Sequence, residues 1–147
     1  MTTSLRPLLL VLLVSLFFAA CDDADLTRDG RPATLVGTAW RVLSVNGRAP
    51  VVRSEPTAIF AAGQVKGSAG CNSYGGSYQY EPSTGAIAFH ELSMTAMGCL
   101  EPGRNEFEGL FSTAISQATS ASIDPHGRLV LTGPGGQILL AVDGVPS

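Results

Sequence analysis

The chain of 147 residues carries nine lysines and arginines against twelve acidic residues, a net charge of −3. Nucleic-acid-binding proteins and polybasic membrane-surface proteins depend on clustered basic side chains, so this charge balance argues against both classes. Seventeen glycines, nine prolines and a charged fraction of only 14% indicate a turn-rich globular domain and exclude a helical bundle or a disordered chain.

The first twenty residues are predicted to be a secretory signal. Arg6 precedes an apolar run over residues 8–18 that only Ser15 interrupts. As a helix this run would span about 16 Å, which is too short for a hydrocarbon core of about 30 Å. The pattern is therefore typical of a signal peptide and not of a transmembrane helix.

Cys21 directly follows two alanines and is the predicted site of a lipid anchor. A cysteine in this place resembles the lipoprotein box of bacteria, in which the thiol is linked to diacylglycerol and the new N-terminus is acylated. Ordinary cleavage that leaves a free thiol is the alternative. Acyl chains would hold the protein stably on the inner or the outer membrane, with its domain in the periplasm. The polar residues 21–34 are predicted to be a flexible tether.

Residues 35–143 are predicted to form one domain of short strands joined by turns. Strands are expected near residues 40–45, 58–61, 65–68, 77–80, 86–92, 122–124, 129–131 and 138–142, separated by Gly, Pro and Asn. In the first of them, alternation places Trp40, Val42 and Ser44 on one face. The expected fold is mainly β, a small antiparallel barrel-like meander of about eight strands.

One segment has the period of an α-helix and is predicted to pack on the sheet. Its apolar residues recur at i, i+3, i+4, i+7, i+8 and i+11, namely at Phe107, Leu110, Phe111, Ala114, Ile115 and Ala118. Pro102 lies near its start, and the acids at 101, 106 and 108 favour the positive end of the helix dipole.

Cys71 and Cys99 remain once Cys21 is assigned to lipid, and an even pair in an exported protein predicts a disulfide. A metal site that combines these cysteines with His90 and His126 is the alternative. It is disfavoured because structural zinc ligands come in close pairs, whereas these four are scattered along the chain. No metal and no cofactor is expected.

Three motifs in order carry a resemblance to a known family. They are Leu35-x-Gly37-Thr38-x-Trp40, the run Gly67–Tyr78 that reads G-x-x-G-C-N-x-Y-x-G-x-Y, and Thr95-x-Met97-Gly98-Cys99. With the helix that follows, the chain resembles the META domain family, which includes HslJ-like bacterial lipoproteins, over about residues 35–142. The resemblance implies a small barrel-like fold with one helix and no assigned reaction, with links to heat shock, motility and antibiotic resistance.

The Gly67–Tyr78 loop has two interpretations. It is either a tight turn held by a Cys71–Cys99 bridge, or a binding loop that presents Asn72, Tyr74 and Tyr78 to a partner. No pair of acids, nucleophile motif or phosphate loop predicts an enzyme.

The leading hypothesis is therefore a monomeric, non-catalytic envelope lipoprotein that acts in stress tolerance or envelope maintenance through binding. A carrier of a small apolar ligand and an inhibitor of an envelope enzyme are the alternatives.

Overall fold

The computed structural model describes residues 30–51 and 53–142. Its elements are, in chain order, β1 (Thr38–Val45), β2 (Thr57–Ala61), β3 (Gln64–Ser68), β4 (Ser73–Glu81), β5 (Ala86–Met94), α1 (Arg104–Ser116), β6 (Ser120–Ile123), β7 (Leu129–Gly133) and β8 (Gly136–Val142). The predicted signal and Cys21 lie outside the described residues. Within those ranges, no helix has the length and apolarity needed to cross a bilayer.

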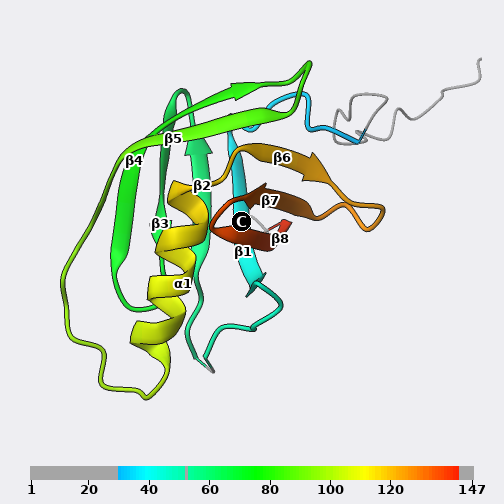
Figure 1. Ribbon diagram of the computed structural model, residues 1–147. Coiled ribbons are helices and arrows are strands. Elements are labelled where there is room, and N and C mark those ends of the chain that lie inside the picture. Colours follow the sequence, from blue (N-terminus) through cyan, green and yellow to red (C-terminus); the bar gives the residue numbers. More distant parts are fainter. Residues whose placement is uncertain (1–29, 52, 143–147) are drawn as a thin grey trace, which may run out of the picture.

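The strands form a closed antiparallel barrel in which each strand pairs with its neighbour in the chain and β8 pairs with β1 (Figure 1). The prediction of a mainly β meander of about eight strands with one helix is confirmed. Short hairpins account for the order, because antiparallel neighbours need only tight turns between them. Closure pairs strand edges that would otherwise stay open to other chains.

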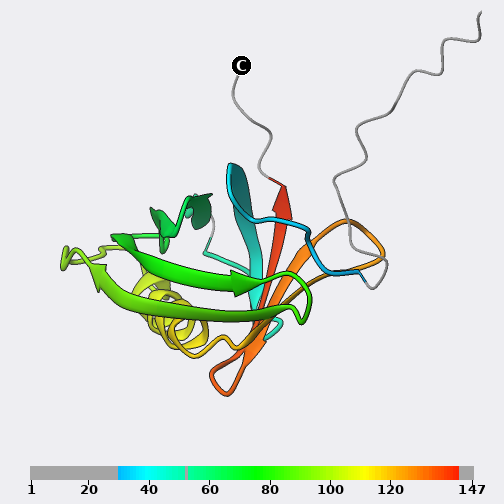
Figure 2. The ribbon, with the colours of Figure 1, turned by 90° about the horizontal axis from the view of Figure 1, so that it is seen from above.

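Strand pairing in the barrel is weakest between β5 and β6, where a single residue pair, Ala86 with Ser120, joins the two strands. Helix α1 packs against β1, β5, β7 and β8 and covers this gap (Figures 1 and 2). Its buried residues are Phe107, Phe111, Ala114 and Ile115. The predicted stripe thus faces the barrel, with Leu110 half-buried at its border. The helix replaces the missing strand pairing with apolar contact.

Aromatic side chains fill the barrel interior. The ring centroid of Phe60 lies 5.0 Å from that of Tyr78 and 6.4 Å from that of Phe89. All three side chains are buried, and Phe60 is 1% exposed. The interior is therefore a packed core, as small barrels require.

The simple alternation predicted for β1 is wrong after Val42, because the strand contains a β-bulge. The pairing of β1 with β8 shifts register between Val42 and Ser44. Because one extra residue reverses the facing of all that follow, Val45 is fully buried whereas Ser44 is only half-buried. Simple alternation had placed Ser44 and not Val45 beside Trp40.

The last five residues of the predicted tether, 30–34, contact the domain. Pro32 is buried, and its carbonyl oxygen accepts a hydrogen bond of 2.6 Å from the Tyr80 hydroxyl. The carbonyl of Gly30 accepts another, of 2.6 Å, from the amide of Ile123. These contacts attach residues 30–34 to the domain, because backbone groups of this polar segment pair with groups far along the chain.

A second bulge holds Glu91 in the left-handed region, with φ 53°. This conformation costs a residue with a Cβ about 1–2 kcal/mol, whereas glycine adopts it freely at an entropic cost of about 0.5–1 kcal/mol. Glu91→Gly is expected to raise the free energy of unfolding by about 0.5–1 kcal/mol, as measured by urea denaturation. Glu91→Ala keeps the strain and is the control; an equal gain in both variants would contradict the strain argument.

Candidate functional site

The turn between β3 and β4 brings together residues from three distant parts of the chain. The amide of Ala69 donates to the carbonyl of Asn72 at 2.8 Å, which closes the turn. Gly70 lies inside this turn with a φ of 111°, a positive value that glycine adopts without a steric penalty. Cys71 and Asn72 are thereby directed towards the segment after β5 and the first turns of α1.

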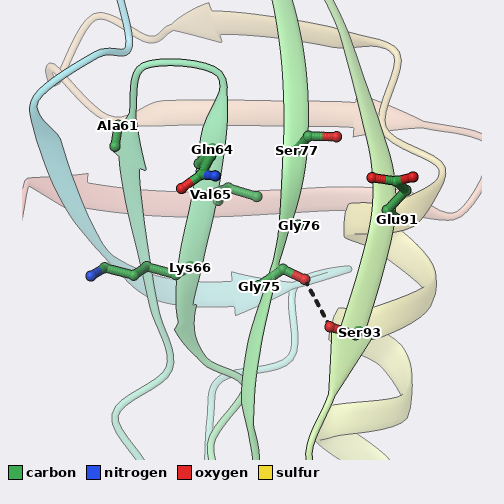
Figure 3. A pocket seen from close by; sticks show the side chains of 9 residues that line it. All are labelled: Ala61, Gln64, Val65, Lys66, Gly75, Gly76, Ser77, Glu91 and Ser93. Atoms are coloured by element: carbon green, nitrogen blue, oxygen red, sulfur yellow. Dashed lines mark hydrogen bonds between the residues drawn. The ribbon is translucent and has the colours of Figure 1, made fainter.

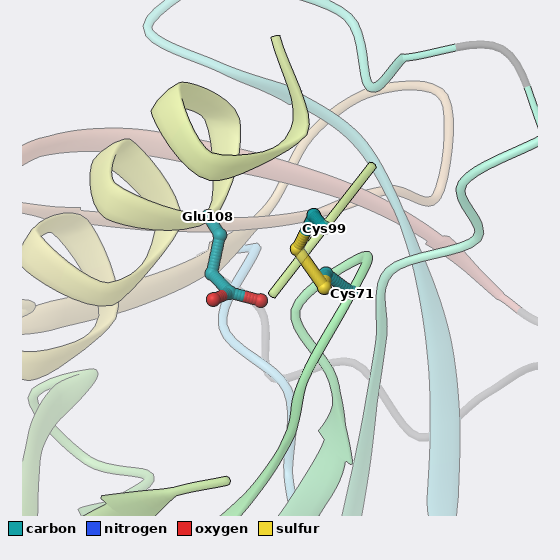
Figure 4. A group of neighbouring side chains, drawn as sticks. All are labelled: Cys71, Cys99 and Glu108. Atoms are coloured by element: carbon teal, nitrogen blue, oxygen red, sulfur yellow. A yellow bond between two sulfur atoms is a disulfide. The ribbon is translucent and has the colours of Figure 1, made fainter. Parts of the chain in front are cut away.

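Cys71 and Cys99 form a disulfide, with their Cα atoms 5.9 Å apart (Figure 4). The predicted bridge is confirmed. It ties the β3–β4 turn to the segment that leads from β5 into α1, across a sequence separation of 28 residues. Figure 4 shows the Glu108 carboxylate pointing towards this bridge from α1.

Asn72 is the centre of a buried hydrogen-bond network beside the disulfide, and it is 3% exposed. Its side-chain oxygen accepts from the Thr95 hydroxyl at 2.9 Å and from the Met97 amide at 2.7 Å. Its side-chain nitrogen donates to the Met97 carbonyl at 3.2 Å and to Glu108 Oε1 at 2.7 Å. Every polar group of this buried amide therefore has protein partners.

Glu108 completes the network and was missed as a site residue. Its Oε2 accepts from the backbone amide of Asn72 at 2.7 Å, so one carboxylate binds two donors of the same residue. From the sequence, Glu108 was predicted only to favour the positive end of the helix dipole. Glu108 lies next to Phe107 and three residues before Phe111, at the border of the buried stripe. This position could have identified it from the sequence as a half-buried acid.

Tyr74 and Tyr78, the other residues of the predicted binding loop, also point inwards. Tyr74 is 5% exposed, its hydroxyl donates to the Thr57 carbonyl at 2.9 Å, and its ring centroid lies 5.2 Å from that of Phe111. Tyr78 is 6% exposed within the aromatic core. These contacts support the first interpretation, a structural turn, because none of the three side chains is presented at the surface.

Burial raises the pKa of the Tyr74 phenol above its ordinary value near 10. The unfolded chain loses this proton near pH 10 while the folded protein keeps it, so stability falls as pH rises above about 10. Tyr74→Phe is expected to make this decline shallower in urea denaturation between about pH 8 and 11. Burial also raises the pKa of Tyr80, which is only half-buried, so Tyr80→Phe should change the slope less than Tyr74→Phe does. An unchanged slope in Tyr74→Phe would contradict the assignment.

The described residues contain one cluster of three potential metal ligands, Cys71, Cys99 and Glu108, whose ligand atoms lie within 4.8 Å of one another. The thiolate is the form of cysteine that binds metals, and here both sulfurs belong to the disulfide. His90 and His126 are exposed and do not belong to this cluster. The structure therefore does not bring together the four residues of the alternative metal site.

The chain matches one known protein family. The model of the META domain family matches residues 33–144. A search of the curated proteins found no match.

Three solved structures are similar at low identity. An NMR structure of a protein from Burkholderia xenovorans shares 22% identity with a TM-score of 0.60, covering 86% of this chain and 97% of that one. A second NMR structure shares 23% identity with a TM-score of 0.57, covering 72% and 89%. The crystal structure of a DUF4847 family protein from Bacteroides vulgatus shares 17% with a TM-score of 0.51, covering 74% and 94%. These likenesses concern the fold alone.

Proposed function

The chain belongs to the META domain family, and on this premise we propose that it is a lipid-anchored envelope protein whose domain acts by binding, without catalysis. Stress tolerance or envelope maintenance is the proposed role, from the resemblance to HslJ-like lipoproteins. The domain is proposed to work as a monomer in the periplasm.

The disulfide is the observation that carries this proposal. Disulfides persist in oxidising compartments outside the cytoplasm, so the Cys71–Cys99 bridge supports export. Since two of the three cysteines are paired, Cys21 is left as the single cysteine for lipid attachment directly after the predicted signal.

The length of chain between Cys21 and the first described contacts would limit the distance of the domain from the membrane. Nine residues lead from Cys21 to Gly30, where the described contacts with the barrel begin. Fully extended, they would span at most about 30 Å. The end of the barrel that holds Gly30 would face the bilayer, and the segment before α1 would lie at the other end (Figure 1).

The hydrogen bonds of the buried Asn72–Glu108 cluster support binding without catalysis. Asn72 and Glu108 are bonded to each other and to backbone groups, so they hold the fold together and leave no group free to act on a substrate.

The alternative of an apolar ligand carrier is not favoured, because aromatic rings fill the barrel interior where such a ligand would lie.

The inhibitor alternative is favoured by one feature, the segment between β5 and α1. Both backbone groups of Met97 are held by Asn72, yet the Met97 side chain is 61% exposed, and Leu100 is 95% exposed. A rigid loop that presents apolar side chains binds at low entropic cost. Immobilised protein should retain a stoichiometric envelope enzyme, and Leu100→Ser should lose it; recovery of no enzyme counts against this alternative.

Lipid attachment is tested by replacing Cys21. Cells grown with labelled palmitate should incorporate label into the wild-type protein, and the membrane fraction should contain it. Cys21→Ser removes the thiol that accepts the lipid, so label and membrane association should both be lost. Cys71→Ser is the matched control and should keep the label. Label retained in Cys21→Ser would refute the anchor.

A further inference from the structure

A surface hollow of about 400 Å³ lies on the outer face of the sheet and shares no residue with the Asn72 network (Figure 3). Strands β2, β3, β4 and β5 contribute to it. The floor is made by β4, and side chains of β3 and β5 stand on either side. The residues used below are Gln64 and Lys66 on β3, Gly75 and Ser77 on β4, and Glu91 on β5.

The floor is low because position 75 has no side chain, and packing does not demand this. A Cβ on Gly67 would come within 2.1 Å of the Thr57 carbonyl oxygen, and one on Gly76 within 2.8 Å of the His90 carbonyl oxygen. A Cβ on Gly75 would find nothing nearer than 3.7 Å, and its φ lies outside the left-handed region. Glycine inside a strand lowers stability and often marks a bulge, a bend or the close approach of a ligand. The bulge lies beside Gly75, opposite Gly76, whereas Gly75 itself keeps its regular pairing with Ser93.

Opposite charges flank this floor, and within the described part of the chain they have no partners. Lys66 is the only lysine of the chain. Neither its ammonium group, nor the Glu91 carboxylate, nor the Gln64 amide has a hydrogen bond or ion pair to the residues that the structure describes. Glu91 lies in the bulge and lines the hollow, and Figure 3 shows one of its carboxylate oxygens on the side of β5 that faces β4.

The two charges select the chemistry of a ligand. A simple anion would be repelled by Glu91, and a metal ion or amine would be repelled by Lys66. A molecule with both an ammonium and a carboxylate group satisfies the two together. Strands β3 and β5 lie about 10 Å apart on either side of β4, and the termini of an extended dipeptide are about 7 Å apart. The flexible Lys66 side chain, which extends away from Gly75 in Figure 3, can turn to close the remaining distance.

We propose that this hollow binds a small zwitterion of dipeptide size, with the ligand carboxylate on Lys66, its ammonium group on Glu91 and its backbone over Gly75. The Gln64 amide and the Ser77 hydroxyl are placed to bond the peptide group. This inference deepens the proposed binding role and rests on it, but it is independent of the lipid anchor. Loss of acylation and loss of dipeptide binding are therefore separate results.

The test is an NMR titration of the full chain in detergent micelles with glycylglycine. Amide signals of Lys66, Gly75 and Glu91 should shift saturably. N-acetylglycylglycine lacks the ammonium group and glycylglycinamide lacks the carboxylate, so each should bind about fivefold more weakly, as loss of one exposed ion pair predicts. Absence of saturable shifts, or equal affinity for the three probes, would overturn the proposal.

Variants assign the two ends of the ligand. Lys66→Met should no longer distinguish glycylglycine from glycylglycinamide, and Glu91→Gln should no longer distinguish glycylglycine from N-acetylglycylglycine. Gly75→Val should fill the floor and lower affinity at least tenfold without lowering the unfolding midpoint. Gly98→Val is its matched control, because a Cβ at position 98 meets nothing within 4 Å, and one at position 75 meets nothing nearer than 3.7 Å. Unaltered binding by Gly75→Val would contradict the placement of the ligand.

Discussion

Asn72→Ala is expected to lower the free energy of unfolding by about 3–4 kcal/mol. The substitution removes four side-chain hydrogen bonds at once, two to Met97, one to Thr95 and one to Glu108. It also leaves the Glu108 carboxylate, which is half-buried, with fewer donors. An unsatisfied buried polar group costs about 1–3 kcal/mol, more for a charged one, so the loss exceeds that of an average surface substitution.

Urea denaturation followed by circular dichroism measures this loss. Asn105→Ala is the matched control, because Asn105 lies on the exposed side of α1 and should change stability by no more than about 0.5 kcal/mol. Glu108→Gln should lie between the two, since the amide retains one acceptor but places a donor against a donor of Asn72. If Asn72→Ala were as stable as the control, the network would not be a determinant of stability.

Removal of the disulfide is expected to cost about 3–4 kcal/mol in the chain-entropy model. The bridge closes a loop with a sequence separation of 28 residues, so its loss lets the unfolded chain expand. The double substitution Cys71→Ala with Cys99→Ala should lower the midpoint of urea denaturation accordingly. A reductant should lower the wild-type midpoint by a similar amount and leave the variant unchanged. A reductant that does not affect the wild-type protein would contradict the prediction.

The two losses should not add. The disulfide and Asn72 hold the same two segments, the β3–β4 turn and the stretch from Thr95 to Cys99. Once the bridge is gone, this stretch is free to leave, and the network contributes less to the folded state. The combined variant should therefore lose less than the sum of the separate losses, which a double-mutant cycle will show as a coupling of about 0.5–3 kcal/mol.

For some residues, the local sequence pattern was sufficient to predict which side chains are buried. Phe107, Phe111, Ala114 and Ile115 recur at helical spacing, and all four are buried on α1. Ile87 and Phe89 are two residues apart and therefore share one face of a strand, and both are buried on β5. These patterns are readable because burial on one face of a helix or strand follows directly from its backbone period. The disulfide was predictable because, in a chain predicted to be exported, assigning Cys21 to lipid left one pair of cysteines.

The site was less predictable, because its residues act through contacts across the fold. The motif around Asn72 was visible, but whether its side chains point out or in depends on which segments pack on the turn. Glu108 lies 36 residues away from Asn72, and only docking of α1 makes them partners. The bulge at Glu91 depends on register between β4 and β5, which no property of β5 alone specifies.

By itself, then, the sequence determined the β class, the single helix, the pairing of Cys71 with Cys99 and the family, since these follow from periodicity, parity and motif order. The tertiary structure alone decided that Asn72, Tyr74 and Tyr78 are buried, that residues 30–34 contact the domain, and that Lys66 and Glu91 line one hollow. The physical reason is that burial and pairing between distant residues are set by barrel closure and helix docking. Barrel closure and helix docking thus decide which side chains are buried, and local sequence patterns alone do not specify this.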